Sequence, residues 1–192
     1  MLFESYRFEK TEINEKRSIK LPSDGLKARH LEFDECNKIY AVNINKRWHS
    51  RLPNSQEKPW QFAFKAHFRG VTFAIALWNN PSARTLPNNW LELRRLACSN
   101  DAPKNTPSRF MAHMVNFFRD NCPEKEKCIS YQDTSVHEGT IYKAAGWEVG
   151  HITKARKRKR DYKKPGTDRL YRKDSNGKDV ASARKLRWEK EL

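Results

Sequence analysis

The sequence lacks the cysteine pairs that bind structural metals and the long apolar runs that cross membranes. Its four cysteines contain no Cys-x-x-Cys pair, which excludes a zinc knuckle and a compact disulfide framework; they are Cys36, Cys98, Cys122 and Cys128. Reduced thiols are therefore expected. Met1–Lys20 lacks the apolar segment of a signal peptide, and no later apolar run approaches the ~18 residues of a membrane-spanning helix. We expect a cytoplasmic protein that does not contact a membrane.

Acidic residues are also scarce relative to basic ones. The 192 residues include 39 Lys and Arg against 23 Asp and Glu, which gives a formal net charge of +16. This excess favours a polyanionic partner, because binding to phosphates releases counterions. Nucleic acid is the first candidate, and the alternative is a basic surface without a specific partner. The length suits one globular domain with a tail, since domains commonly contain about 100–150 residues.

Hydrophobic patterns predict an α+β fold with a mixed α/β sheet. Apolar residues recur at helical spacing in three segments, which are 33–48, 108–121 and 137–146. β-branched and aromatic runs predict five strands, which are 61–68, 71–78, 90–98, 127–133 and 147–153. Asp34 is the expected cap of the first helix, and Pro107 suits the first turn of the second. This order of elements predicts helices on the faces of the sheet.

Composition divides the chain into three parts. These are an N-terminal extension over 1–32, a folded domain over 33–153 and a basic arm over 154–192. The segment that follows Lys154 is almost wholly charged, so it cannot bury enough apolar surface to fold by itself. Its densest run is the candidate nucleic-acid contact, made of Arg156, Lys157, Arg158, Lys159 and Arg160. A nuclear-import-like run and a plain solubilising tail are the alternatives.

A polar loop that leads into a helix N-terminus forms the first candidate binding site. The segment 99–107 joins the third predicted strand to the second predicted helix. First-turn N–H groups, the helix dipole, hydroxyl groups and cations could together hold a pyrophosphate. The residues concerned are Lys104, Asn105, Thr106, Ser108 and Arg109. The alternative is that the hydroxyl groups only cap the helix.

A second stretch carries a resemblance to a known family. A strand end delivers Ser130, Tyr131 and Asp133, and the next helix presents Tyr142 four residues before Gly146. The element order, the strand-loop-helix phosphate site and the phrase IYKAAGW resemble the GCN5-related N-acetyltransferases. Within that superfamily, LELRRLACSNDAPKNTPSRFM and ISYQDTSVHEGTIYKAAGW resemble the bacteriophage Mom family, whose members modify adenine in DNA. The resemblance covers the predicted folded domain.

The resemblance implies that the protein binds acetyl-CoA or another acyl-CoA. The pantetheine would lie along the strand that ends at Ala97, and the pyrophosphate would lie at Lys104–Arg109. The chain departs from the superfamily in its phosphate loop. The usual glycines are replaced by the segment Pro103–Ser108, although glycine is the residue that allows the closest approach of the backbone to a ligand.

The resemblance also implies catalytic residues. N-acyl transfer needs a neutral amine, a polarised thioester carbonyl and an acid that protonates the leaving thiolate. Tyr142 matches the family's general acid, Asp133 could act as base or orient the amine, and His49 lies where the family places its acceptor-binding loop. A near-neutral pKa would suit His49 to proton transfer. Arg94 and Arg95 should point to opposite faces of their strand, and Arg95 is expected to enter the cleft.

Each of these residues also has a structural alternative. Tyr142 could be a core aromatic, His49 a surface histidine, and Arg95 the partner of a structural salt bridge with Asp133. His49, Asp133 and Tyr131 could also bind a divalent metal, as mixed N and O ligands that lie far apart in sequence.

Three functions compete at this stage. The leading hypothesis is an acyltransferase that modifies the exocyclic amine of adenine in DNA, which for a phage protein in its bacterial host is an anti-restriction function. The first alternative is an ordinary N-acetyltransferase that acts on a protein or small-molecule amine. The second is a non-catalytic nucleic-acid-binding protein on the same fold. Trp48, Trp60 and Trp78 could stack on a flipped base, or could simply be buried.

Overall fold

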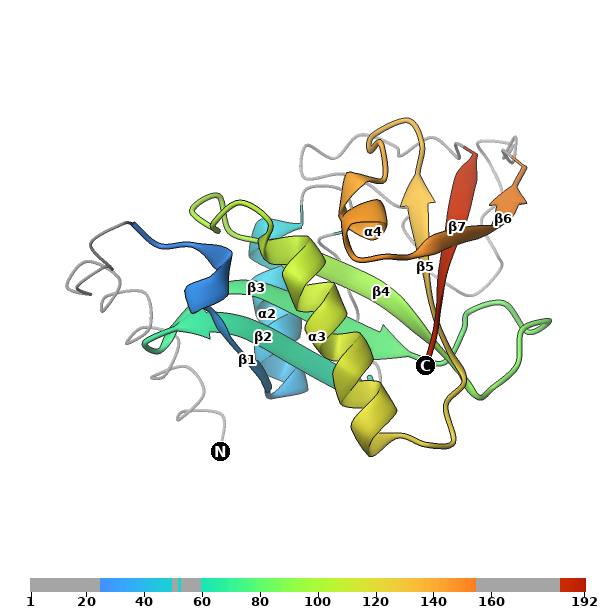
Figure 1. The fold of residues 1–192 in the computed structure, drawn as a ribbon, viewed down its shortest axis with the longest axis horizontal. Coiled ribbons are helices and arrows are strands. Elements are labelled where there is room, and N and C mark those ends of the chain that lie inside the picture. Colours follow the sequence, from blue (N-terminus) through green and yellow to red (C-terminus); the bar gives the residue numbers. More distant parts are fainter. Residues whose placement is uncertain (1–24, 50–51, 53–59, 155–183) are drawn as a thin grey trace, which may run out of the picture.

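The computed structural model describes residues 25–49, 52, 60–154 and 184–192 of the chain. Seven strands of the described residues form a sheet in the order β1-β2-β3-β4-β5-β7-β6 (Figure 1). The strands are β1 (Glu32–Glu35), β2 (Phe62–Phe68), β3 (Val71–Asn79), β4 (Trp90–Cys98), β5 (Lys127–Asp133), β6 (Glu148–Thr153) and β7 (Lys185–Glu191). The helical elements are the 3-10 turn η1 (Ala28–His30) and the helices α2 (Lys38–Trp48), α3 (Thr106–Asn121) and α4 (Thr140–Ala144).

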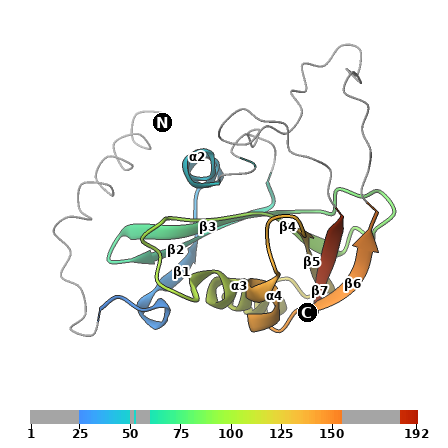
Figure 2. The same cartoon turned by 90° about the horizontal axis from the view of Figure 1, so that it is seen from above.

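The sheet separates two helical layers. Figure 2 shows α2 on one face of the sheet and α3 with α4 on the other. The larger core lies between the sheet and α3 and contains Phe64, Trp78 and Phe118, whereas the core under α2 contains Val42 and Ile75. β4 and β5 pair in parallel and the other neighbours pair antiparallel. The predicted α+β fold with a mixed sheet is confirmed.

The first predicted helix is wrong over its N-terminal part. Residues 33–35 of that prediction belong to β1, which pairs with β2, and α2 begins only at Lys38. Asn37 caps α2, because its side chain accepts a hydrogen bond from the Ile39 N–H at 2.8 Å. The predicted cap, Asp34, lies within β1. Strand pairing with a distant segment overrides the helical spacing of the local sequence here.

The end of the chain also differs from the sequence prediction. Residues predicted to continue the basic arm form β7, which lies between β5 and β6. Trp188 of β7 is buried, and its Nε1 donates to Oε1 of Gln132 at 2.7 Å. Lys127 forms ion pairs with Glu189 at 2.9 Å and with Glu191 at 2.8 Å. Charged residues therefore fit into the sheet here because they find partners on the neighbouring strand.

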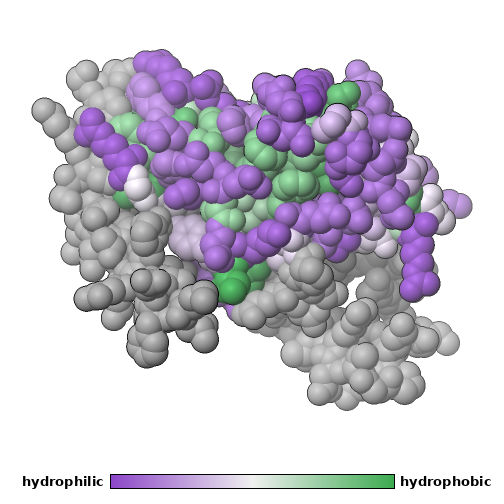
Figure 3. Space-filling view, turned by 90° about the horizontal axis from the view of Figure 1, so that it is seen from below, coloured by the Kyte–Doolittle hydropathy of each residue, from purple (hydrophilic) through white to green (hydrophobic). Residues whose placement is uncertain are grey.

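The described surface is mainly hydrophilic. Figure 3 shows hydrophilic residues over most of one face, around a smaller hydrophobic area. Four large hydrophobic side chains are exposed among the described residues, and they are Ile39, Val136, Val149 and Ile152. Within the described ranges, no helix combines the length and the apolar character needed to cross a bilayer.

Candidate active site

The candidate site lies where β4 and β5 separate. The two strands pair only from Trp90 to Leu93 on β4 and from Lys127 to Ser130 on β5. Beyond these residues β4 runs toward the loop before α3, and β5 runs toward the loop before α4 (Figure 1). The separating ends, 94–98 on β4 and 131–133 on β5, are named the wedge. Because β5 does not pair with the far end of β4, backbone groups on that edge can bond to a ligand.

A β-bulge in β4 determines which side chains face each helical layer. Leu77 of β3 pairs with Arg95 and the next residue pairs with Leu93, so Arg94 is the extra residue. Ala97 belongs to the core under α2, and side chains two apart on a strand share a face, so Arg95 also faces the α2 side. A guanidinium nitrogen of Arg94 donates instead to the carbonyl oxygen of Asn80 at 2.6 Å.

Tyr142 lies at the start of the wedge. Its hydroxyl is 3.0 Å from the Ser130 hydroxyl, which donates to the carbonyl oxygen of Leu93 at 3.2 Å. Since Ser130 has one hydroxyl hydrogen, Tyr142 is the donor in their shared bond. The Tyr142 ring stacks on Trp188, with ring centroids 5.2 Å apart. Burial raises the pKa of Tyr142, so the hydroxyl keeps its proton at neutral pH. The residue is thus both a core aromatic and a protonated group at the wedge.

Asp133 holds the loop that follows β5. Its Oδ1 accepts hydrogen bonds from the Ser135 N–H at 3.0 Å and from the Ser135 hydroxyl at 2.5 Å. Its carbonyl oxygen accepts from the His137 N–H at 3.2 Å. The Gln132 side-chain amide donates to the carbonyl oxygen of His137. The carboxylate of Asp133 therefore shapes the turn that carries His137 beside the wedge.

His49 ends α2 on the opposite side of the sheet from α3. Burial, together with the charges of Arg95 and His137, lowers its pKa from 6.5 to about 4. Its Nδ1 accepts the Leu52 N–H at 3.2 Å, which places the proton of the neutral ring on Nε2. The near-neutral pKa expected for His49 is therefore wrong. At neutral pH the ring is an uncharged hydrogen-bond donor whose pKa the charges of Arg95 and His137 help to lower.

His137 lies in no motif that marks a site residue. It stands in the loop TSVHEG, and only its position between a strand end and a helix marked it as close to the wedge. The described residues contain no group of three or more His, Cys, Asp and Glu side chains that could hold a metal ion. A site of His49, Asp133 and Tyr131 contains only two side chains of these four types, so it stays a prediction. Trp60 and Trp78 are buried, so neither presents a face for stacking on a base.

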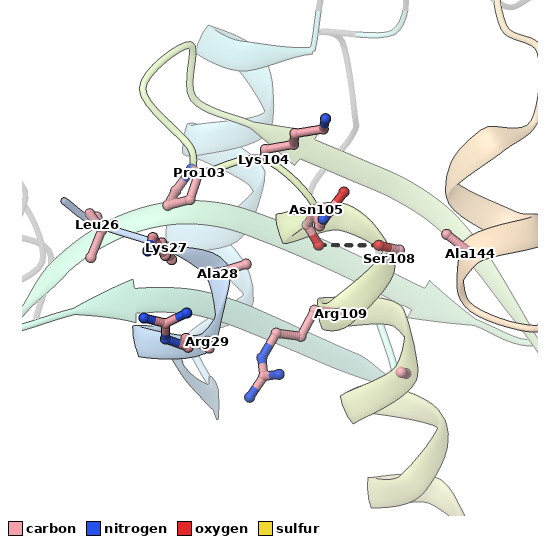
Figure 4. Close-up of a pocket in the computed structure, with 11 residues that line it drawn as sticks. Leu26, Lys27, Ala28, Arg29, Pro103, Lys104, Asn105, Ser108, Arg109 and Ala144 are labelled. Carbon is pink, nitrogen blue, oxygen red and sulfur yellow. Dashed lines mark hydrogen bonds between the residues drawn. The ribbon is translucent and has the colours of Figure 1, made fainter. Parts of the chain in front are cut away.

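A pocket of about 580 Å³ lies between η1 and the N-terminus of α3 (Figure 4). Its lining residues include four of the predicted phosphate-site residues, which are Lys104, Asn105, Ser108 and Arg109. The segment before β1 supplies the rest of the charged lining through Lys27 and Arg29. These two cations were assigned to the N-terminal extension, and no motif in the sequence marks them. The pocket lies on the α3 side of the sheet.

Two further residues assigned to acyl-CoA binding lie outside the pocket lining. Thr106 is fully buried, and its hydroxyl donates to the carbonyl oxygen of Pro103 at 2.7 Å. The Thr106 hydroxyl therefore stabilises the turn at the start of α3, in agreement with the alternative that it serves the helix end and not the ligand. Ala97 is buried in the core under α2, on the strand that leads from the wedge to the pocket.

The phosphate loop reaches a glycine-like conformation without glycine. Asn105 precedes α3 with φ of 68° and ψ of 6°, a left-handed conformation that glycine adopts readily and asparagine more easily than most residues. Pro107 in the first turn has no N–H, and the Thr106 N–H already donates to Pro103 at 3.1 Å. This helix start offers few backbone donors, so side chains must supply most of the anion contacts.

Comparisons with known proteins agree with this architecture. The model of the Mom protein family matches residues 30–191. The fold is similar to that of the ribosomal-protein-S18-alanine N-acetyltransferase from Escherichia coli, with 12% identity, a TM-score of 0.56 and coverage of 84% of this chain and 94% of that chain. A Bacillus subtilis acetyltransferase solved in complex with CoA is similar at 10% identity and a TM-score of 0.54, with coverage of 84% and 99%. No curated protein sequence matches the chain.

The family match begins before β1 and ends at the last residue of β7. It therefore includes the strand that composition alone assigned to a basic arm. The family match, the sheet order and the separation of β4 from β5 together confirm the resemblance to the GCN5-related N-acetyltransferases and the Mom family. The chain has the fold of the GCN5-related N-acetyltransferases and belongs to the Mom protein family.

Proposed function

We propose that this protein transfers an acyl group from acyl-CoA to the exocyclic amine of adenine in DNA. The observation that carries the proposal is the family match over residues 30–191, because Mom-type proteins resemble acetyltransferases in fold and modify adenine in DNA. The anticipated setting is phage anti-restriction modification in the cytoplasm of a bacterial host. The geometry supports the proposal at three places, which are the pocket, the wedge and the ends of the basic segment.

The pocket and the wedge fit the two ends of an acyl-CoA. The cations of the pocket suit the pyrophosphate, and Lys104 and Arg109 stand beside the first turn of α3. The edge of β4 that β5 leaves unpaired offers amide groups to the pantetheine arm. The acyl thioester would then enter the wedge near Tyr142. When bound, acyl-CoA supplies the activated thioester carbonyl, and the chain's own groups bind, orient and handle protons.

The chemistry of the wedge suits the proton balance of the reaction. The adenine nitrogen forms a bond to the acyl carbon, the carbon–sulfur bond breaks, the amine loses one proton and the departing thiolate gains one. Tyr142, whose pKa burial raises, holds a proton that it can give to the thiolate. The Nε2–H of neutral His49 and the guanidinium of Arg95 suit the negative charge that develops on the carbonyl oxygen. Asp133 acts by shaping the loop that carries His137.

The basic segment is tied to the sheet beside the wedge. Arg156 to Arg160 lie outside the described residues, but the segment 155–183 leaves after β6 and returns at β7. At the return point the carbonyl oxygen of Arg184 accepts bonds from the Thr134 N–H at 3.3 Å and hydroxyl at 2.9 Å. Since Thr134 directly follows β5, the start of the loop after β5 meets the end of the basic segment there. We propose that the segment contacts the DNA backbone close to the site of transfer.

Mass spectrometry of nucleosides tests the proposal. DNA from cells that produce the protein should contain an acylated adenosine, and DNA from cells that produce equal soluble amounts of Tyr142→Phe should not. If the parent protein leaves DNA unmodified while acylating a protein or small-molecule amine, the protein is an ordinary acetyltransferase. If it binds DNA but transfers no acyl group, the non-catalytic alternative is correct.

A further inference from the structure

The pocket between η1 and α3 carries more positive charge than a pyrophosphate needs. Its eleven lining residues include four cations and no Asp or Glu; the cations are Lys27, Arg29, Lys104 and Arg109. A pyrophosphate diester carries about two negative charges, and a terminal phosphate monoester adds about −1.5 to −2 at pH 7. Acyl-CoA has both groups, because its ribose carries a 3′-phosphate in addition to the pyrophosphate. The number of cations therefore matches the whole nucleotide end of the molecule.

The two arginines stand on opposite walls of this pocket. Arg29 belongs to η1, and Arg109 belongs to the first turns of α3. In Figure 4 the Arg109 side chain extends from α3 toward η1, whereas Lys104 extends away from η1. The guanidinium carbon of Arg109 is 6.0 Å from the centroid of the Phe33 ring, and that ring stacks on Phe110 at 5.5 Å. A pair of stacked aromatic rings, of which Phe110 is buried and Phe33 half-buried, thus supports one wall of the pocket.

The two kinds of cation in the pocket suit two different phosphate groups. A guanidinium binds a phosphate through two parallel hydrogen bonds, whereas an ammonium acts as a compact point charge. Lys104 and Ser108 lie beside the start of α3, and Arg29 and Arg109 flank the space toward η1. A phosphate monoester with three terminal oxygens suits a pair of guanidinium groups better than one, because it can accept from both.

We propose that Arg29 and Arg109 bind the 3′-phosphate of acyl-CoA, while Lys104 and Ser108 bind its pyrophosphate. This assignment rests on the proposed acyl-CoA binding and makes the protein selective for CoA over 3′-dephospho-CoA. It gives the segment before β1 a ligand-binding role, although composition places that segment outside the domain. Arg29 is the specificity-determining residue in this proposal. It belongs to η1, whereas the groups assigned to the pyrophosphate lie at the start of α3.

Titration calorimetry with CoA and with 3′-dephospho-CoA tests the assignment. The parent protein should bind CoA at least about tenfold more tightly, since charge-assisted hydrogen bonds to one phosphate are lost in the analogue. Arg29→Ala should weaken CoA binding about tenfold and leave 3′-dephospho-CoA binding unchanged. Arg84→Ala is the matched control, because Arg84 is exposed in the loop between β3 and β4, at the opposite end of β4 from the pocket.

Four outcomes would overturn the assignment. Equal affinity of the parent for the two ligands excludes a 3′-phosphate site but leaves acyl-CoA binding intact. An equal loss for both ligands in Arg29→Ala places Arg29 at the pyrophosphate instead. Weaker binding to a DNA duplex in Arg29→Ala, with CoA binding unchanged, would mean that the pocket accepts backbone phosphates of DNA. Failure of the parent to bind either ligand removes the acyl-CoA proposal itself, and the 3′-phosphate site with it.

Discussion

The pocket and the wedge hold their polar groups in opposite ways. The cations of the pocket, such as Arg29 and Arg109, are exposed to solvent. In the wedge, Tyr142 is 8% exposed and Ser130 is 3% exposed, and both are joined in one chain of hydrogen bonds. Exposed cations contribute little to folding, whereas buried hydrogen-bonded groups are part of the core. Substitutions in the pocket should therefore change binding alone, and substitutions in the wedge need shape-conserving variants to separate chemistry from stability.

The largest effect is expected at the wedge, from Tyr142→Phe. The variant keeps the ring that stacks on Trp188 and removes the hydroxyl that would protonate the thiolate. General acid catalysis contributes about 10²–10⁴-fold, so the yield of modified adenine should fall by that amount. Loss of one buried hydrogen bond should cost only about 1 kcal/mol of unfolding free energy. Nucleoside mass spectrometry at matched soluble levels measures the yield of modified adenine, and urea unfolding measures the free energy of unfolding.

Tyr40→Phe is the control for that variant. It removes another tyrosine hydroxyl, which hydrogen bonds to Thr72 at 2.8 Å, in the layer between α2 and the sheet. It should lower stability by a similar amount and leave DNA modification nearly unchanged. If both variants reduce modification equally, Tyr142 acts through stability alone and the wedge is not the place of proton transfer.

The next largest effect concerns the basic segment between β6 and β7. Deleting residues 154–192 would remove β7 from the sheet, so a length-preserving change is needed. We expect replacement of the five basic residues Arg156–Arg160 by glutamine to weaken DNA binding about 10²–10³-fold at moderate salt. The slope of log K against log salt should become shallower by about 4–5, because each phosphate contact contributes about 0.9. CoA binding should not change. An unchanged salt slope would show that this run only increases solubility.

A third prediction uses the pKa of His49. The unfolded chain binds a proton near pH 6.5, whereas the folded chain keeps His49 neutral until about pH 4. The unfolded state therefore binds more protons between these values, so stability rises with pH through this window and falls as the pH drops. From pH 6.5 to 5, the contribution to the loss is about 2 kcal/mol, at 1.36 kcal/mol per pKa unit.

His49→Asn isolates this contribution. The asparagine Oδ1 can accept the Leu52 N–H in place of Nδ1, and the variant cannot titrate. Its unfolding free energy in urea should decline less steeply between pH 6.5 and 5 than that of the parent, while the other histidines contribute equally to both. Parallel pH dependences would contradict the lowered pKa of His49.

The elements closest to the proposed donor site were the most predictable from the sequence. The strand, loop and helix around Lys104 and Arg109 depend on local signals, namely an apolar run, prolines and helical spacing. The motif IYKAAGW identified Tyr142, which stands four residues before a glycine. That glycine, Gly146, has a positive φ of 69°, as expected at the end of a helix. Local sequence determines such features, so it also reveals them.

The features that the sequence did not reveal depend on partners far along the chain. β7 pairs with β5 across more than fifty residues, and the ion pairs of Lys127 make its charges compatible with a sheet. Arg29 joins the pocket only because η1 folds back beside α3. The lowered pKa of His49 arises from burial and from two residues on other elements. Periodicity and composition contain no information about such contacts.

The smallest expected effect concerns the exposed cations of the pocket. Lys104→Glu reverses one charge at the rim of the pocket, where the side chain is exposed and carries no structural hydrogen bond among the described contacts. Its affinity for acetyl-CoA should fall about tenfold, and its melting temperature without ligand should match that of the parent, since exposed charges contribute at most about 1 kcal/mol to folding. The rise in melting temperature at millimolar acetyl-CoA should shrink accordingly. Lys38→Glu, on α2 across the sheet, makes the same charge change away from the pocket and should keep the full rise. If Lys104→Glu and Lys38→Glu respond alike to acetyl-CoA, the net charge of the protein governs binding and the pocket does not. The exposed cations of the pocket would then have no specific binding role to set against the buried groups of the wedge.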